Sequence, residues 1–359
     1  MPKNLTETKR SLNHPSTALQ SPSHSDYDSR SARDGWTACR SLFLRSCLLA
    51  FACLLVCVCL ITNSSRLLAV EVSFEQSEHA VKVLVDGQHF TTYLFHYGIK
   101  PVFWPIYGPT NAAMTRAYPM QDPKMDSLDS FDHIHQRSLW LTHGDVNGVD
   151  FWTEANGSGV IQHSEFVKIE APTLVTRNRW MKRDGTELLL EERTMTFGAD
   201  KHGRWIDLDS KLTAVCDSVV FGDTKEGTLG LRVPGVLDVD KKKGGRIVNS
   251  EGLTDADAWG KQAAWVDYNG VIDGKPVGIT IMNHPGSFRY PTYWHVRTYG
   301  LFAANPFGQG AFTHDRSKPG TCELKKGESL TLRYRLYFHE GNEKTAGVAD
   351  VFQQYSGQP

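Results

Sequence analysis

Polar residues that could do chemistry crowd into one short stretch of the chain. The sequence Asp-His-Ile-His-Gln-Arg occupies residues 132–137, and His-Gly-Asp follows at 143–145. On a β-strand, two histidines two residues apart point to the same face with about 7 Å between their Cα atoms. Such a pair could share a ligand or a metal ion, or act as acid and base, although it could also merely hydrogen-bond to carbonyls. The candidate catalytic residues here are His133, His135, Arg137 and His143, with Asp145 as a binding residue.

A second cluster lies some 150 residues further along the chain, where aromatic, histidine and arginine side chains alternate. Flat aromatic faces beside hydrogen-bonding groups suit a polyhydroxylated ligand. The alternative is that these rings are ordinary core and that the charges cover its rim. His295 is the catalytic candidate here, and the binding candidates are His284, Tyr293, Trp294, Arg297, Tyr299 and Asn305.

A third candidate is the pair Lys225 and Glu226, which follows an apolar run. An amine and a carboxylate this close could form an acid/base pair if burial moved their pKa values toward neutrality. As a solvated turn with an ion pair, they would do nothing chemical. We assign Glu226 a catalytic role and Lys225 a binding role.

Several motifs are absent from residues 73–359: the P-loop, Gly-x-Ser-x-Gly, His-Glu-x-x-His and Cys-x-x-Cys. Phosphoryl transfer, α/β-type serine hydrolysis and zincin chemistry are therefore disfavoured. No metal ligand set and no particular cofactor is predicted. The formal net charge of −1 gives no basic field for nucleic acid. Cys216 and Cys322 could form a disulfide or remain separate thiols.

Local patterns predict an all-β fold. Asp-Gly pairs at 86–87, 184–185 and 273–274 separate apolar runs and are typical of type I′ hairpins. Residues 329–339 alternate with a period of two, and 348–355 carry the only convincing helical pattern. We expect one large two-sheet antiparallel β-sandwich with a short C-terminal helix.

The N-terminal part differs in composition from the rest. Residues 47–61 are entirely apolar and follow Arg40 and Arg45, which indicates either a transmembrane anchor or a signal-peptide core with its N-terminus inside. The folded part is then extracytoplasmic (periplasmic), either membrane-anchored or secreted. The expected organisation is a disordered tail (1–40), the apolar segment (41–62), a linker (63–72) and a single β-sandwich domain (73–359).

Three blocks carry a resemblance to a known family: DHIHQRSLWLTHGDVNGVDFW, FGDTKEG and HPGSFRYPTYWHVRTYGLFAANPFG. They resemble signature blocks of a bacterial family called PmoA after a methane-oxygenase subunit, and the resemblance runs from about Lys100 to Phe338. This chain has Gln136 where the family has a third histidine, and Ser138 where it has glycine. The methane name is not carried over, because that subunit spans the membrane several times and this sequence offers one apolar span at most.

The resemblance implies a sandwich similar to galactose-mutarotase-like proteins, in which a histidine acts as acid and a glutamate as base. His133, His135 or His295 with Glu226 would take those roles. The leading hypothesis is an exported carbohydrate-active enzyme that hydrolyses, eliminates or epimerises a sugar or oligosaccharide. The alternatives are a non-catalytic carbohydrate-binding or envelope-structural protein, and a metal-dependent oxidoreductase built on His133, His135 and His143. The enzymatic hypothesis requires the two histidine clusters to meet at one hollow.

Overall fold

The computed structural model describes residues 70–122 and 128–358. Residues 68–359 constitute one compact unit. The predicted tail, the apolar segment and most of the linker lie outside the described residues, so those three assignments stay predictions. Among the described helices, none has both the length and the apolar character needed to cross a membrane.

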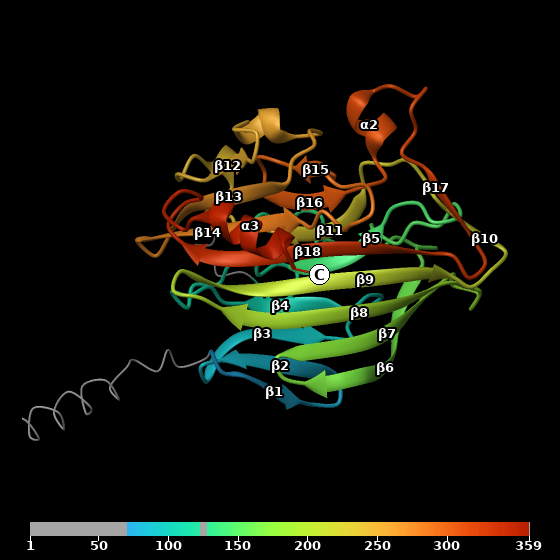
Figure 1. Ribbon diagram of the computed structural model, residues 1–359, viewed down its shortest axis with the longest axis horizontal. Coiled ribbons are helices and arrows are strands. Elements are labelled where there is room, and N and C mark those ends of the chain that lie inside the picture. The colour runs from blue at the N-terminus through green and yellow to red at the C-terminus, as the bar shows by residue number, and fades with distance from the viewer. Residues whose placement is uncertain (1–69, 123–127, 359) are drawn as a thin grey trace, which may run out of the picture. The chain divides into compact units, whose positions relative to one another are not determined.

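The described chain is built from two eight-stranded antiparallel sheets and a two-stranded ribbon (Figure 1). In spatial order, the first sheet contains β1 (Val72–Gln76), β2 (Ala80–Val85), β3 (Gln88–Leu94), β4 (Val102–Ile106), β5 (Leu139–His143), β11 (Gly227–Arg232), β16 (Leu301–Asn305) and β15 (Tyr293–Val296). The second sheet contains β12 (Arg246–Asn249), β13 (Trp265–Ile272), β14 (Lys275–Asn283), β18 (Ser329–Glu340), β9 (Gly203–Ala214), β8 (Glu187–Ala199), β7 (Thr173–Met181) and β6 (Val160–Glu170). The ribbon pairs β10 (Ser218–Phe221) with β17 (Cys322–Lys325).

Within residues 70–122 and 128–358 the helical segments are few and short: η1 (Val239–Lys241), η2 (Asp255–Ala258), α2 (Gln309–Thr313) and α3 (Val348–Ser356). A single apolar core, drawn from both large sheets, fills the space between them. The predicted fold class, a large two-sheet antiparallel sandwich with a short C-terminal helix, is confirmed. Cys216 and Cys322 are free thiols, so the disulfide alternative is not realised.

The predicted Asp-Gly hairpins join neighbouring strands in all three places. Asp86-Gly87 between β2 and β3 and Asp273-Gly274 between β13 and β14 have positive φ at both residues, as a type I′ turn requires. The loop between β7 and β8 is longer, spanning residues 182–186, and it is closed by a hydrogen bond from the Lys182 N–H to the Thr186 carbonyl. There only Gly185 has positive φ. The hairpin prediction is correct at this site, but the predicted two-residue turn is wrong.

The alternation in β18 separates its two faces as predicted. Its apolar side chains point into the core, and they are Leu330, Leu332, Tyr334, Leu336 and Phe338. Arg333 and Arg335 lie on the other face, where they pair with Asp209 and Asp207 of β9. The C-terminal helix α3 covers part of this outer face (Figure 1), and its Tyr355 ring lies 4.7 Å from the Arg335 guanidinium.

A buried ion pair lies within the sandwich. Glu191 and Arg193 on β8 are almost fully buried, and Arg193 donates to both carboxylate oxygens at 2.7 and 3.0 Å. The same carboxylate accepts hydrogen bonds from Trp180 Nε1, Ser210 Oγ and Asn178 Nδ2. Each lone pair of this desolvated charge therefore has a partner, which is the condition for tolerating it in the interior.

Candidate functional site

The strand register places one catalytic candidate on the outer face of the first sheet. Residues paired directly across antiparallel strands project to the same face. The pairings Trp140–Gly230, Gly230–Ala303 and Ala303–His295 therefore form one row across β5, β11, β16 and β15. A Cβ at Gly230 would lie 2.5 Å from the Trp140 ring, so only glycine lets this indole lie over β11. Gly230 and Ala303 add little bulk to the middle of this row, and His295 at its end is 2% exposed and packs against Trp259 and Phe312.

His133 and His135 do not lie on a strand, which corrects the prediction. They flank a turn before β5 in which Gln136 donates its N–H to the carbonyl of His133, and His133 has φ of 45°. The two rings still approach each other, with centroids 5.7 Å apart. The turn, and not the two-residue repeat of a strand, brings them together.

The two histidine-bearing segments meet, as the enzymatic hypothesis requires. The His133 ring stacks on Tyr299, with centroids 5.4 Å apart and planes inclined by 6°. Two guanidinium groups flank the same tyrosine, Arg232 at 4.9 Å and Arg297 at 5.5 Å from its ring. Arg232 also pairs with Asp132 at 3.1 Å, next to the histidine turn. Segments far apart in sequence thus form one group of side chains, which we call the polar cluster: His133, His135, Glu226, His295, Arg297 and Tyr299.

A main-chain hydrogen bond fixes the tautomer of His295. Its Nδ1 lies 2.7 Å from the carbonyl oxygen of Lys225, so Nδ1 carries the proton and donates. Nε2 is then the basic nitrogen. Asn305 holds the same loop by donating to the carbonyl of Thr224 at 2.8 Å. The Glu226 carboxylate follows directly and forms an ion pair with the Lys225 ammonium.

Burial keeps both key imidazoles neutral. Desolvation lowers the pKa of His135 to about 4, and the neighbouring Lys100 and His133 act in the same direction. Desolvation also lowers the pKa of His295 to about 4. The Glu226 carboxylate opposes both shifts, which shows that it acts electrostatically on both rings. At neutral pH these two rings are proton acceptors, not acids.

A buried lysine holds the histidine turn by a hydrogen bond to its backbone. Lys100 is 2% exposed, pairs with Glu154 at 2.8 Å and donates to the carbonyl of His135 at 2.9 Å. Burial lowers its pKa to about 8. Glu154 also pairs with the candidate Arg137 at 2.9 Å. Arg137 is therefore already paired with a carboxylate. It is connected to the polar cluster through Glu154 and Lys100, which binds the His135 carbonyl.

Two candidates project into the core instead of joining the cluster. His143 is fully buried against Phe221 and Phe307, and its Nε2 lies 2.8 Å from the Gly222 carbonyl oxygen. Trp294 is fully buried and donates from Nε1 to the carbonyl of Ala263 at 2.9 Å. Strand alternation places His143 on the core face of β5 with Leu139 and Leu141, and places Trp294 on the opposite face of β15 from His295.

Four further candidates are placed near the site or away from it. Asp145 accepts the Gly148 N–H in its own turn, and His284 packs on Tyr355 of α3, so neither contacts the cluster. Tyr293 stacks on Phe312 of α2 at 5.7 Å, and Asn305 is a buried support for the 224–226 loop. The sequence reading missed Lys100, Glu154 and Arg232, because their roles arise only from contacts between segments far apart in the chain.

The three-histidine metal site of the oxidoreductase hypothesis is not assembled, since His143 lies in the core while His133 and His135 lie outside it. The residues that the structure describes contain no group of three or more His, Cys, Asp or Glu side chains arranged to hold a metal ion.

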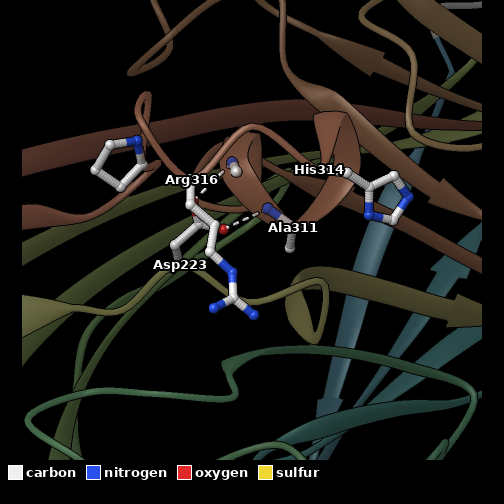
Figure 2. A pocket seen from close by; sticks show the side chains of 6 residues that line it. Asp223, Ala311, His314 and Arg316 are labelled. Atoms are coloured by element: carbon white, nitrogen blue, oxygen red, sulfur yellow. Dashed lines mark hydrogen bonds between the residues drawn. The ribbon is translucent and has the colours of Figure 1, made fainter.

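A hollow of about 640 Å³ adjoins the polar cluster across Trp259. The Trp259 ring lies 6.2 Å from His295, 6.5 Å from His314 and 5.7 Å from the Arg297 guanidinium. Figure 2 shows Asp223 of this hollow hydrogen-bonded to the backbone at the start of α2. Trp259 thus lies between His295 of the polar cluster and His314 of the hollow.

A family profile decides what the chain belongs to: it matches residues 80–353 under the description "Family of unknown function (DUF6807)". The chain belongs to the DUF6807 family. No match to a curated protein was found for this DUF6807 chain. The family match prints only DUF6807 and says nothing of the PmoA resemblance.

Solved structures similar to this DUF6807 protein share little sequence with it. The galactosidase domain of alpha-galactosidase-sucrose kinase, AgaSK, matches at 10% identity and a TM-score of 0.38, over 76% of this chain and 42% of that chain. A putative aldose 1-epimerase from Escherichia coli K12 matches at 10% identity and 0.32, over 76% and 99%. A galactose mutarotase related enzyme from Lactobacillus acidophilus matches at 10% identity and 0.34, over 75% and 97%. These values are too low to assign any of those activities to this chain.

Proposed function

We propose that this protein is a carbohydrate-active enzyme that moves protons on a sugar at the polar cluster. The observation that supports the proposal is the meeting of the two histidine segments, in which His133 of one segment stacks on Tyr299 of the other. Titratable groups with strongly perturbed pKa values, gathered beside aromatic rings, are the usual mark of an acid/base site.

The residues divide into proton-transfer groups and binding groups. His295 Nε2 accepts a proton from a sugar hydroxyl or C–H, because its Nδ1–H is committed to the Lys225 carbonyl. Glu226, the residue after Lys225, stabilises the imidazolium that forms on His295. Its carboxylate is the second proton acceptor of the site. Trp259 offers an aromatic surface to the sugar ring, and Tyr299, whose ring is covered by His133 and Arg232, holds those groups in place. Hydrolysis, elimination and epimerisation all include such a proton transfer. The three reactions are distinguished by the products that form from a panel of sugars.

We expect an acid limb near pH 4 in the pH profile of kcat/KM. A histidine whose pKa is lowered to about 4 is a free base above that value, so activity stays level from neutral pH down and is lost as pH falls through about 4. An ordinary histidine would give a limb near 6.5. Rates measured from pH 3.5 to 8, with circular dichroism at each pH to show that the fold persists, provide the check. A limb between pH 6 and 7 would remove His135 and His295 from the role of base.

A non-catalytic carbohydrate-binding protein would use the same aromatic surface. Calorimetry and mass spectrometry on one glycan panel separate the two functions, because binding without any product supports the non-catalytic one. The same glycan panel also tests whether the ligand is a sugar at all. If no glycan gives binding heat or product, both the enzymatic and the non-catalytic function are contradicted.

We also propose that the folded domain works on the extracytoplasmic side, tethered or released by the apolar segment at 47–61. A reporter enzyme that is active only outside the cytoplasm, fused after Pro359, is expected to be active. A fusion of residues 63–359 alone is expected to be inactive, and activity of that shorter fusion contradicts the proposal.

A further inference from the structure

The Arg297 guanidinium is held by rings and not by a carboxylate. It lies 5.7 Å from the Trp259 ring and 5.5 Å from the Tyr299 ring. No carboxylate among the described residues pairs with it, although most arginines around it have one. Stacking occupies the face of the planar group and leaves the N–H donors at its edge free for a ligand.

Two ion-pair networks around the cluster also carry more cations than carboxylates. Asp132 is shared by Arg116 and Arg232, at 2.6 and 3.1 Å. Glu154 is shared in the same way by Lys100 and Arg137, at 2.8 and 2.9 Å. Each network therefore keeps a positive charge that its own carboxylate does not neutralise, in a protein whose formal net charge is −1.

Three other carboxylates nearby have partners of their own. Glu226 pairs with Lys225. Asp150 accepts the backbone N–H groups of Trp152 and Thr153, and Asp129 accepts those of Ala117 and Gly235. None of these three pairs with Arg297. A low local dielectric strengthens the attraction of the remaining positive charge for an anion.

The adjoining hollow has the same character. Its one carboxylate, Asp223, accepts the backbone N–H groups of Gly310 and Ala311 (Figure 2) and also that of Gly320. Of the other side chains that line it, Arg316 carries a positive charge and His314 adds an imidazole. An acidic chain that extended past Trp259 would meet further positive charge there.

From these observations we infer that the substrate of the polar cluster is an acidic sugar, and that Arg297 binds its anionic group. This inference rests on the proposed function and specifies its substrate class. A carboxylate, as in a uronic acid, and a sulfate ester both present paired oxygens that match the guanidinium edge. The aromatic rings hold that edge in place before binding, so little side-chain entropy is lost.

The test is calorimetric titration of the intact folded protein with matched sugars. D-Galacturonate and D-galactose 6-sulfate are compared with D-galactose, and D-glucuronate with D-glucose. The acidic members are expected to bind more tightly, and the stronger of the two acidic types identifies the anion. Arg297→Gln is expected to raise Kd for acidic sugars roughly 10- to 100-fold, the range for a charge-assisted hydrogen-bonded pair, and to leave neutral sugars nearly unchanged.

Two further variants keep the test decisive. Arg297→Lys retains the charge without the forked edge and is expected to fall between wild type and glutamine. Arg179→Gln, on the outer face of the second sheet and paired with Glu187, is the matched control and is expected to bind like wild type. Thermal melts show that each variant is folded.

The outcomes separate the inference from the proposed function. If neutral sugars bind and react as well as acidic ones, or if Arg297→Gln weakens both classes equally, the acidic-sugar inference is wrong while the enzyme proposal stands. If no sugar of either class binds, both are wrong. Weakening of acidic binding by rising salt in wild type, but not in Arg297→Gln, supports the inference independently.

Discussion

His135→Ala abolishes most of the turnover while the protein keeps its melting temperature within a few degrees. His135 is half-buried, and its imidazole is a neutral base next to Lys100 and within the field of Glu226. Loss of a general acid/base group costs on the order of 10²- to 10⁴-fold in rate. Its backbone carbonyl, which accepts the Lys100 hydrogen bond, remains in the variant, so the turn keeps its anchor.

The measurement is product formation from the sugar panel, by mass spectrometry and anomeric NMR, alongside a thermal melt. His79→Ala is the surface control, since 64% of that side chain is exposed, and it is expected to change neither quantity. His143→Ala is the opposite control, because removal of a fully buried ring should lower stability. A His135→Ala protein with undiminished turnover, or one that loses stability as His143→Ala does, would sink the catalytic assignment.

Glu191→Ala is expected to lower the free energy of unfolding by about 3–5 kcal/mol, the range for breaking a buried ion pair. The substitution leaves the Arg193 guanidinium uncompensated in the interior and also removes the acceptor of Trp180 Nε1 and Ser210 Oγ. Urea denaturation followed by fluorescence and circular dichroism gives the free energy, provided that the m-value is unchanged.

Its matched control lies on the exposed face of the same sheet. Glu187→Ala breaks a solvent-exposed pair with Arg179 at 3.0 Å and is expected to cost about 0–1 kcal/mol. The double variant Glu191→Leu/Arg193→Met removes both charges and is expected to be more stable than Glu191→Ala alone. A Glu191→Ala variant within about 1 kcal/mol of wild type would show that the interior tolerates an unpaired guanidinium.

Local patterns were enough to predict the architecture. The Asp-Gly pair at 86–87 is typical of a tight turn with positive φ, and β18 alternates because one face packs in the apolar core while the other carries Arg333 and Arg335. The Asp184-Gly185 loop escaped the same rule, because its length depends on the Lys182–Thr186 hydrogen bond and not on the dipeptide alone.

The site was predictable only in part. Residue types identified both histidine segments, and those segments do meet, as the Tyr299–His133 stacking shows. The face to which each side chain points follows from strand register, which sequence spacing alone did not reveal. His143 and Trp294 were therefore assigned to a site from which the alternation of β5 and β15 excludes them. Lys100 and Glu154 carry no local signal, because their ion pair joins two loops across the fold.

The loop before β11 is anchored through its backbone, and this has a consequence for variation at the site. His295 donates to the carbonyl of residue 225 and Asn305 to that of residue 224, so neither anchor depends on the side chain at those two positions. The charge carried at position 225 can therefore drift between related chains without altering which nitrogen of His295 is basic. A substitution of Lys225 can thus change the charge near the ligand while its backbone carbonyl still holds the His295 proton on Nδ1.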